Sequence, residues 1–117
     1  MQPILSQIIR VVAKYAENDS TAGNYRFVLV CGLDEKRRIA EGEWMGYTHN
    51  NSEYYPFLLQ KEPRPCLFLG GEEQYFEPTT IFQQPIEIGS TFTISNSPNS
   101  NEEWSVEYKI TSIHALR

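Results

Sequence analysis

Two segments near the end of the sequence alternate between apolar and polar residues. Most even positions are apolar from 86 to 94 and again from 104 to 110, while the odd positions are polar or glycine. A period of two is typical of a β-strand with one buried face. The intervening residues 96–103 are polar and include Pro98, which is typical of a loop. The sequence therefore predicts a terminal β-hairpin that buries Ile86, Ile88, Phe92, Ile94, Trp104, Val106, Tyr108 and Ile110.

The chain before this hairpin is divided by turn residues into short apolar runs. Strands are predicted at 25–32, 39–46, 54–59 and 66–69. Within the first of these, Val28 and Val30 are expected to be buried, and Pro56 predicts a sheet edge or a strand start for the third. Turns or loops are predicted at 17–24, 33–38, 47–53 and 72–78, the last as a loop or one helical turn.

The segment from Ile4 to Ala16 fits two patterns. A helical stripe runs through Ile4, Ile8 and Val12, whereas alternation from Ile9 to Tyr15 fits a strand. Because the segment is rich in β-branched residues, which suit a sheet, we favour a strand from about Gln7, after a possible helical turn. These segments together predict a mainly β, single-domain fold over residues 1–117. It would be a small antiparallel sandwich or a partly open barrel of about 7–8 short strands, with or without one short helix.

Composition limits the class of protein. A chain of 117 residues suits one domain that folds without a metal or disulfide. Cys31 and Cys66 each adjoin an apolar run and are expected to be buried thiols. No apolar stretch reaches the roughly 20 residues of a membrane span, and the N-terminus lacks the basic region of a secretory signal. We therefore expect a cytoplasmic protein with no membrane partner.

The net charge of −5 is unevenly distributed along the chain. Residues 1–40 hold six basic and four acidic side chains, whereas residues 41–77 hold two basic and seven acidic ones. A negative field disfavours nucleic acid, because contacts with phosphate provide much of the affinity for it. A negative field favours a basic partner. We therefore expect a protein partner, which would be basic if charge determines the choice of partner, and we expect no nucleic acid.

No motif of known catalytic spacing is present. His49 and His114 are far apart in the sequence, and Gly70-Gly71 lacks the Lys-Ser/Thr pair that follows in a phosphate-binding loop. Glu41 and Glu43 alternate as the outer face of a strand would. The sequence thus predicts no catalytic residue, no cofactor and no metal site, and we expect a protein that is not an enzyme.

Aromatic and acidic residues gather in the middle of the chain, on either side of the polar segment 47–53. Aromatic side chains with polar groups concentrate at protein interfaces, and carboxylates around them would suit a basic partner. The alternative interpretation is that many of these aromatics belong to the core. The candidate partner-binding residues are Glu41, Glu43, Trp44, Tyr47, Glu53, Tyr54 and Tyr55.

Three functions are consistent with these features. The first is a small acidic protein-binding module, comparable in size and charge to bacterial immunity proteins or inhibitors that neutralise a basic toxin, because complementary fields speed association. The second is a barrel that binds a small ligand, or a minor enzyme, which would require a cavity with convergent polar groups. The third is a structural or assembly subunit that forms homo-oligomers through an exposed strand edge near Pro56 or Ile81-Phe82.

Overall fold

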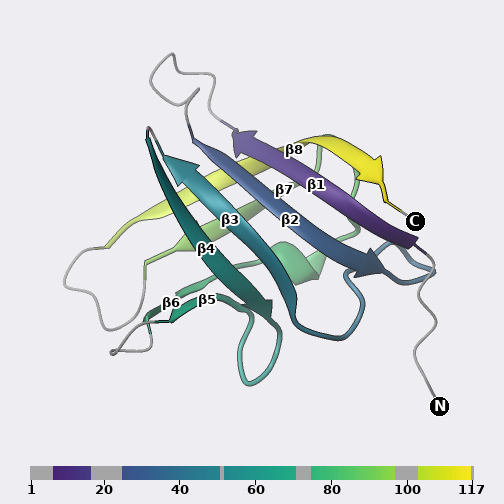
Figure 1. Cartoon of the computed structure of the whole chain (residues 1–117), viewed down its shortest axis with the longest axis horizontal. Coiled ribbons are helices and arrows are strands. Elements are labelled where there is room, and N and C mark those ends of the chain that lie inside the picture. Colours follow the sequence, from purple (N-terminus) through teal and green to yellow (C-terminus); the bar gives the residue numbers. More distant parts are fainter. Residues whose placement is uncertain (1–6, 17–24, 51, 71–74, 97–102, 117) are drawn as a thin grey trace.

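The sheet of this protein curls until its two outermost strands meet (Figure 1). The structure is a computed structural model that describes residues 7–16, 25–50, 52–70, 75–96 and 103–116. The strands run antiparallel in the order β6-β5-β4-β3-β2-β1-β8-β7. They are β1 (Gln7–Tyr15), β2 (Arg26–Leu33), β3 (Trp44–Asn50), β4 (Glu53–Gln60), β5 (Cys66–Gly70), β6 (Tyr75–Pro78), β7 (Thr91–Ser95) and β8 (Ser105–Ala115), with a 3₁₀ turn η2 (Ile81–Gln83) after β6.

The seam between the ends of the sheet is held by threonines. Just after β6, Thr79 forms an isolated bridge with Ile94 of β7. The Thr80 N–H donates to the Thr93 carbonyl at 3.1 Å, and the Thr93 N–H donates to Thr80 Oγ1 at 2.9 Å. These bonds occupy edge groups that would otherwise be unpaired, so the sheet becomes a nearly closed barrel. The prediction of a mainly β antiparallel fold is confirmed, and closure selects the barrel over the sandwich.

Alternation along each strand directs one set of side chains into the barrel. Phe27 lies near the centre of the interior, with its ring centroid 5.3 Å from that of Phe57, 4.9 Å from that of Phe92 and 5.9 Å from that of Tyr108. The core consists of Ile9, Val11, Ala13, Phe27, Leu29, Cys31, Leu33, Ile39, Phe57, Leu59, Leu67, Ile81, Ile86, Phe92, Ile94, Tyr108 and Ile110. The interior is therefore a packed apolar core around an aromatic centre.

The predicted terminal hairpin is confirmed, because β7 pairs with β8 from Thr91↔Lys109 to Ser95↔Ser105. Its predicted inward face is correct for Phe92, Ile94, Tyr108 and Ile110, which are buried, while Trp104 and Val106 are half-buried against the core. The prediction is wrong for Ile88, which is 67% exposed. Residues 86–90 precede β7 and form an irregular segment, so the alternation there does not correspond to a strand.

The N-terminal strand is also confirmed, as β1 begins at Gln7 and pairs with both β2 and β8. The expected helical turn before it and the expected loop 17–24 lie outside the described residues. The two cysteines are buried and free, as expected. Of the two valines expected to be buried in β2, Val28 is buried, but Val30 faces outward and is 39% exposed.

Strand β3 lies further along the chain than the sequence predicted. It begins at Trp44 rather than Ile39, and it continues to Asn50 through residues predicted as a loop. Its polar second half pairs with β4, from Thr48↔Tyr55 to Asn50↔Glu53. Ile39 makes only an isolated bridge with Leu33 before the chain bends. Polar residues are tolerated in this part of β3 because it borders a cavity rather than the packed core.

Pairing with neighbouring strands explains the structure of two further segments. Residues 75–78, predicted as a loop or helical turn, form β6 and pair with β5. The predicted edge position holds only locally, because β4 as a whole lies between β5 and β3. Pro56 lies in the part of β4 that pairs with β3 alone, since β5 pairs only with Leu58–Gln60. At Gly46, a Cβ would lie 2.2 Å from the Val28 carbonyl oxygen, so only glycine fits this approach of β3 to β2.

One end of the barrel is closed by the segment that links β6 to β7. Ile81 of η2 and Ile86 are both buried there. The Ile86 N–H donates to the Arg37 carbonyl at 2.8 Å, and the Arg37 guanidinium donates to the Ile86 carbonyl at 3.2 Å. Since Ile81 and Phe82 belong to this closure, they do not form the exposed strand edge expected from the sequence. The opposite end, on the left in Figure 1, has no such plug among the described residues.

Candidate functional site

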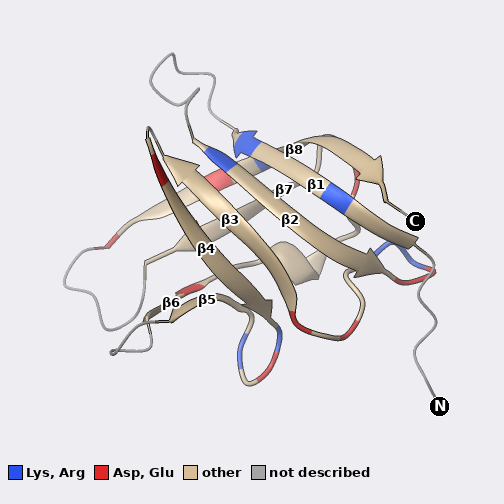
Figure 2. Cartoon of the chain, viewed as in Figure 1, with Lys and Arg blue, Asp and Glu red and all other residues tan. Residues whose placement is uncertain are grey.

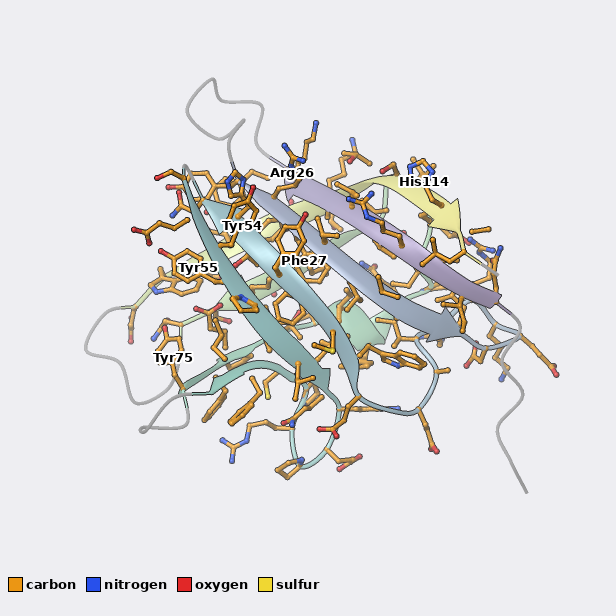
Figure 3. The ribbon with its side chains drawn as sticks, viewed as in Figure 1. Arg26, Phe27, Tyr54, Tyr55, Tyr75 and His114 are labelled. Carbon is orange, nitrogen blue, oxygen red and sulfur yellow. The ribbon has the colours of Figure 1, made fainter. Side chains whose placement is uncertain are left out.

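The open end of the barrel contains a cavity of about 910 Å³. β1, β3, β5 and β7 end around it, and β2, β4, β6 and β8 begin around it (Figure 1). It is lined by Tyr15, Tyr25, Thr48, His49, Asn50, Tyr54, Tyr55, Pro56, Leu69, Gly70, Tyr75, Glu77, Ile94, Trp104, Val106 and Tyr108. We refer to it as the mouth cavity. Figure 3 shows Tyr54, Tyr55 and Tyr75 together at this end of the molecule.

Strand register explains how residues from distant parts of the chain meet in the mouth cavity. Directly opposed residues of antiparallel strands face the same side of a sheet. Tyr15 of β1 opposes Tyr108 of β8, and both point inward with the buried core residues of those strands. Thr48 opposes Tyr55 in the same way, and Glu77 opposes the fully buried Leu67. The lining is thus the continuation of the inward face past the end of the packed core.

A cluster of tyrosines forms one wall of the mouth cavity. The Tyr15 ring stacks on Tyr25, with centroids 4.4 Å apart, and meets Tyr108 edge to face at 5.1 Å. Burial raises the pKa of both Tyr15 and Tyr108 above the ordinary value. Their hydroxyls therefore stay neutral at physiological pH and can both donate and accept hydrogen bonds.

Glu77 is the acidic residue of this lining. Burial raises the pKa of its carboxyl from 4.5 to about 6, and a hydrogen bond with Tyr75 acts in the opposite direction. The carboxylate also raises the pKa of Tyr15 and of Tyr108 through its charge. Neither lysine nor arginine is among the described residues that line the mouth cavity. Glu77 is thus a part-buried acid without a neighbouring cation in the described structure.

One polar atom of the mouth cavity has no hydrogen-bond partner in the described structure. Asn50 Oδ1, at the end of β3, is buried and accepts no hydrogen bond in the described structure. A buried acceptor without a donor costs about 1–3 kcal/mol, and native proteins keep few of them. The Tyr55 hydroxyl, by contrast, donates to Glu53 at the rim. The lining therefore offers a carboxyl, an amide oxygen and several hydroxyls within an aromatic surface.

The seven residues predicted to bind a partner do not form one surface. Glu41, Glu43 and Trp44 lie at one end of β3, where Gln60 Nε2 donates to Glu43 Oε2 at 2.9 Å and Trp44 Nε1 donates to the Ala40 carbonyl at 2.9 Å. Tyr47, Glu53, Tyr54 and Tyr55 lie toward the other end. The six residue steps of β3 span about 20 Å, at roughly 3.3 Å per residue. Binding of a basic protein stays a prediction. The structure places the seven candidate residues on two separate surfaces.

The group nearer the open end is itself divided between the two faces of the sheet. Tyr47 opposes Pro56, and His49 opposes Tyr54, on the outer face. The His49 and Tyr54 rings stack with centroids 4.3 Å apart, and Tyr54 is 63% exposed. Tyr55 has the opposite parity and borders the mouth cavity. Only the Tyr54 and Tyr55 positions thus connect the predicted residues with the cavity lining.

The sequence-based prediction missed the residues that define the cavity chemistry. Tyr15, Tyr25 and Glu77 come from segments far apart in the sequence, and Trp104 and Tyr108 were predicted only as core. The available signal was an aromatic or acidic residue at an inward position near a strand end. That signal becomes specific only when the strand order brings those ends to the same side of a closed barrel.

Metal binding and thiol chemistry find no support in the described residues. No three His, Cys, Asp or Glu side chains described in the structure are placed to hold a metal ion. Burial raises the pKa of the Cys31 thiol to about 12, so it is not a thiolate at neutral pH. In the described part of the chain, no helix is long and apolar enough to cross a membrane.

Basic residues lie close together on neighbouring strands in one part of the barrel wall (Figure 2). Arg26 of β2 opposes Lys14 of β1, and Lys14 also opposes Lys109 of β8. All three are exposed, and no ion pair joins any of them to a described residue. Like charges directly opposite each other destabilise a sheet slightly. This row crosses the wall next to the mouth cavity, because Tyr15 and Tyr25 are its chain neighbours.

No family model, curated protein or solved structure matches this chain, so its function has to be inferred from the geometry and chemistry of the barrel.

Proposed function

We propose that this protein binds a small organic molecule in the mouth cavity. The observation that carries the proposal is a cavity of about 910 Å³ at the end of a packed barrel, lined by aromatic rings and a few polar groups. Ligand sites are typically concave, mostly apolar, about 300–1,000 Å³ in volume and provided with a small number of orienting polar groups. The mouths of β-barrels are a frequent place for them.

The lining supports binding more than catalysis. Tyr15, Tyr25, Tyr108 and Trp104 provide flat apolar surfaces on which a planar or branched ligand can pack. Glu77 and Asn50 Oδ1 supply acceptors that are incompletely satisfied by the protein itself. Among the described lining residues there is no Ser, Cys or Lys, the side chains that most often act as nucleophiles in acyl or group transfer. A ligand-binding barrel is therefore the function that the geometry supports best.

Trp104 provides a direct measurement, because the chain has two tryptophans and Trp44 lies at the other end of β3. In a Trp44→Phe variant, fluorescence of Trp104 should change when a panel of benzene-, indole- and naphthalene-based molecules of neutral, cationic and anionic type is titrated. At least one class should bind with Kd below about 1 mM, equivalent to about −4 kcal/mol, and calorimetry should give the same constant.

A blocking variant with a matched control locates the binding. Thr48→Phe places a ring into the mouth cavity and should weaken binding at least tenfold. Met45→Phe, on the outer face of the same strand where Met45 is 68% exposed, should leave it unchanged. If no molecule of the panel binds, or if both variants bind as tightly as the parent, the proposal is wrong.

A further inference from the structure

We infer that the ligand of the mouth cavity is an organic cation, an amine or quaternary ammonium compound, held by the Glu77 carboxylate among the surrounding aromatic rings. The inference rests on the proposed function and adds the chemical class of the ligand. Its starting point is the position of Glu77, which faces into the barrel opposite the fully buried Leu67. An acid at such a position is costly unless something compensates its charge.

The protein does not supply that compensation within the described structure. No lysine or arginine is among the described lining residues. Arg64, which is close to β6, lies with its guanidinium carbon 4.4 Å from the centroid of the Phe76 ring. Phe76 has the opposite parity to Glu77 on β6, so Arg64 is held on the outside of the barrel. The hydrogen bond with Tyr75 satisfies part of the carboxylate but adds no positive charge.

The rings around the carboxylate fit a cation better than a neutral or anionic ligand. An ammonium group is attracted to the face of an aromatic ring, because the ring quadrupole is negative there. Tyr15, Tyr25, Tyr75, Tyr108 and Trp104 all border the same cavity as Glu77. An anion would be repelled by the carboxylate, and a neutral ligand would leave its charge uncompensated. Aromatic rings combined with one acidic group are the chemistry by which quaternary ammonium groups are recognised.

The ionisable groups around Glu77 predict how binding depends on pH. Tyr15 of β1, Tyr25 before β2, Tyr75 of β6 and Tyr108 of β8 surround the cavity. Burial raises the pKa of Tyr15 and of Tyr108, so these two hydroxyls are neutral at physiological pH. His49 of β3 is a further ionisable group of the lining, with its ring stacked on Tyr54. Because the pKa of Glu77 is about 6, its carboxyl is mostly neutral at pH 5 and mostly ionised at pH 7.5. Affinity for a cation should therefore rise about tenfold over this range.

The test uses benzyltrimethylammonium, whose charge does not change with pH, and its neutral isostere neopentylbenzene, both titrated against Trp104 fluorescence in the Trp44→Phe background. The cation should bind about tenfold more tightly at pH 7.5 than at pH 5, whereas the neutral isostere should change less than twofold. Glu77→Gln should weaken binding of the cation at least tenfold at pH 7.5 and remove its pH dependence. It should leave binding of the neutral isostere within twofold.

His49→Gln is the matched control, and it should keep the pH dependence because Glu77 is still present. The inference is overturned if the cation binds Glu77→Gln as tightly as the parent, if only the neutral isostere binds, or if neither compound binds. A different result would show that the proposed function itself is wrong. In that case Thr48→Phe would not weaken the binding of any ligand. If only the neutral isostere binds and Thr48→Phe blocks that binding, the mouth cavity is a ligand site. In that case the proposed function holds, and only the inference that the ligand is a cation is wrong.

Discussion

The two ends of this barrel are built in opposite ways. At the closed end, Ile81 and Ile86 fill the interior, and reciprocal hydrogen bonds between Arg37 and Ile86 fasten the plug. At the open end, tyrosines surround a cavity, Glu77 has a raised pKa, and Asn50 Oδ1 lacks a donor. The closed end contributes stability, while the open end retains groups that cost stability. Such costs are typical of sites kept for binding rather than for folding.

The largest effect is expected at the closed end. Replacing the buried Ile86 with Asp places a charge without a partner in the core, and the domain should unfold, with a loss above about 4 kcal/mol. Ile88→Asp, two residues away and exposed, should change the free energy of unfolding by less than about 0.5 kcal/mol. Urea denaturation followed by circular dichroism measures both. Equal stability of the two variants would contradict the described plug.

The seam between β6 and β7 should be the next most sensitive region. Thr80→Val removes the acceptor for the Thr93 N–H and should lower the free energy of unfolding by about 1–3 kcal/mol. Thr111→Val, at an exposed position of β8, removes a longer hydrogen bond of 3.3 Å to the Val12 carbonyl and should cost less than about 0.5 kcal/mol. Amide hydrogen exchange at Thr93 should accelerate in the first variant alone. A protected Thr93 amide in Thr80→Val would argue against closure at this seam.

At the open end, stability should depend on pH through Glu77. Its folded-state pKa of about 6 lies above the ordinary 4.5, so the folded protein holds the proton more tightly than the unfolded chain. Its contribution to stability is therefore greatest below about pH 4.5 and is lost as the pH rises through 6. Discounted for partial exposure, this loss is about 1 kcal/mol.

The Glu77→Gln variant isolates this term. Relative to the parent, it should gain about 1 kcal/mol between pH 4.5 and pH 8, measured by chemical denaturation at each pH. Glu43→Gln is the control, because Glu43 is exposed and lies just before β3, at the closed end of the barrel. The difference in free energy of unfolding between Glu43→Gln and the parent should stay constant over this pH range. A difference for Glu77→Gln that also stays constant would mean that the carboxyl is fully solvated.

The smallest effect concerns the basic row beside the mouth cavity. Lys14→Thr removes a positive charge that lies directly opposite both Arg26 and Lys109. The free energy of unfolding should rise by a few tenths of a kcal/mol at low salt, and the gain should vanish in 1 M NaCl. Lys36→Thr, in the exposed turn after β2, should give no such gain. An equal gain in both variants would show that repulsion within the row is not the cause, since removing either lysine makes the net charge of −5 more negative.

Much of the fold was predictable, because one-sided burial leaves a period of two in the sequence. That period predicted the hairpin of β7 and β8 and favoured the strand from Gln7. It failed at Ile88, which alternates correctly but lies outside any strand, and at residues 48–50, which extend β3 although they are polar. The first failure lies in the irregular segment before β7, and the second lies where the inward face borders the mouth cavity instead of packed core.

The candidate site was much less predictable. The sequence directed attention to Glu41, Glu43, Trp44, Tyr47, Glu53, Tyr54 and Tyr55, because they are close together in the chain. The structure distributes them over two ends and two faces, and of these seven only Tyr54 and Tyr55 are in the cavity lining. Composition also identified the acidic middle of the chain, but it gave no reason to separate Glu77 from the other six acidic residues there.

The sequence by itself determined the antiparallel β class, the alternation of most strands and the burial of both cysteines, because these properties depend on neighbouring residues. Only the tertiary structure decided that the sheet closes through Thr79 and Thr80, that one end is plugged, and that Tyr15, Glu77 and Tyr108 share a cavity. Closure and register depend on pairings between residues far apart in the chain, and a single alternating strand carries no record of which strand lies beside it.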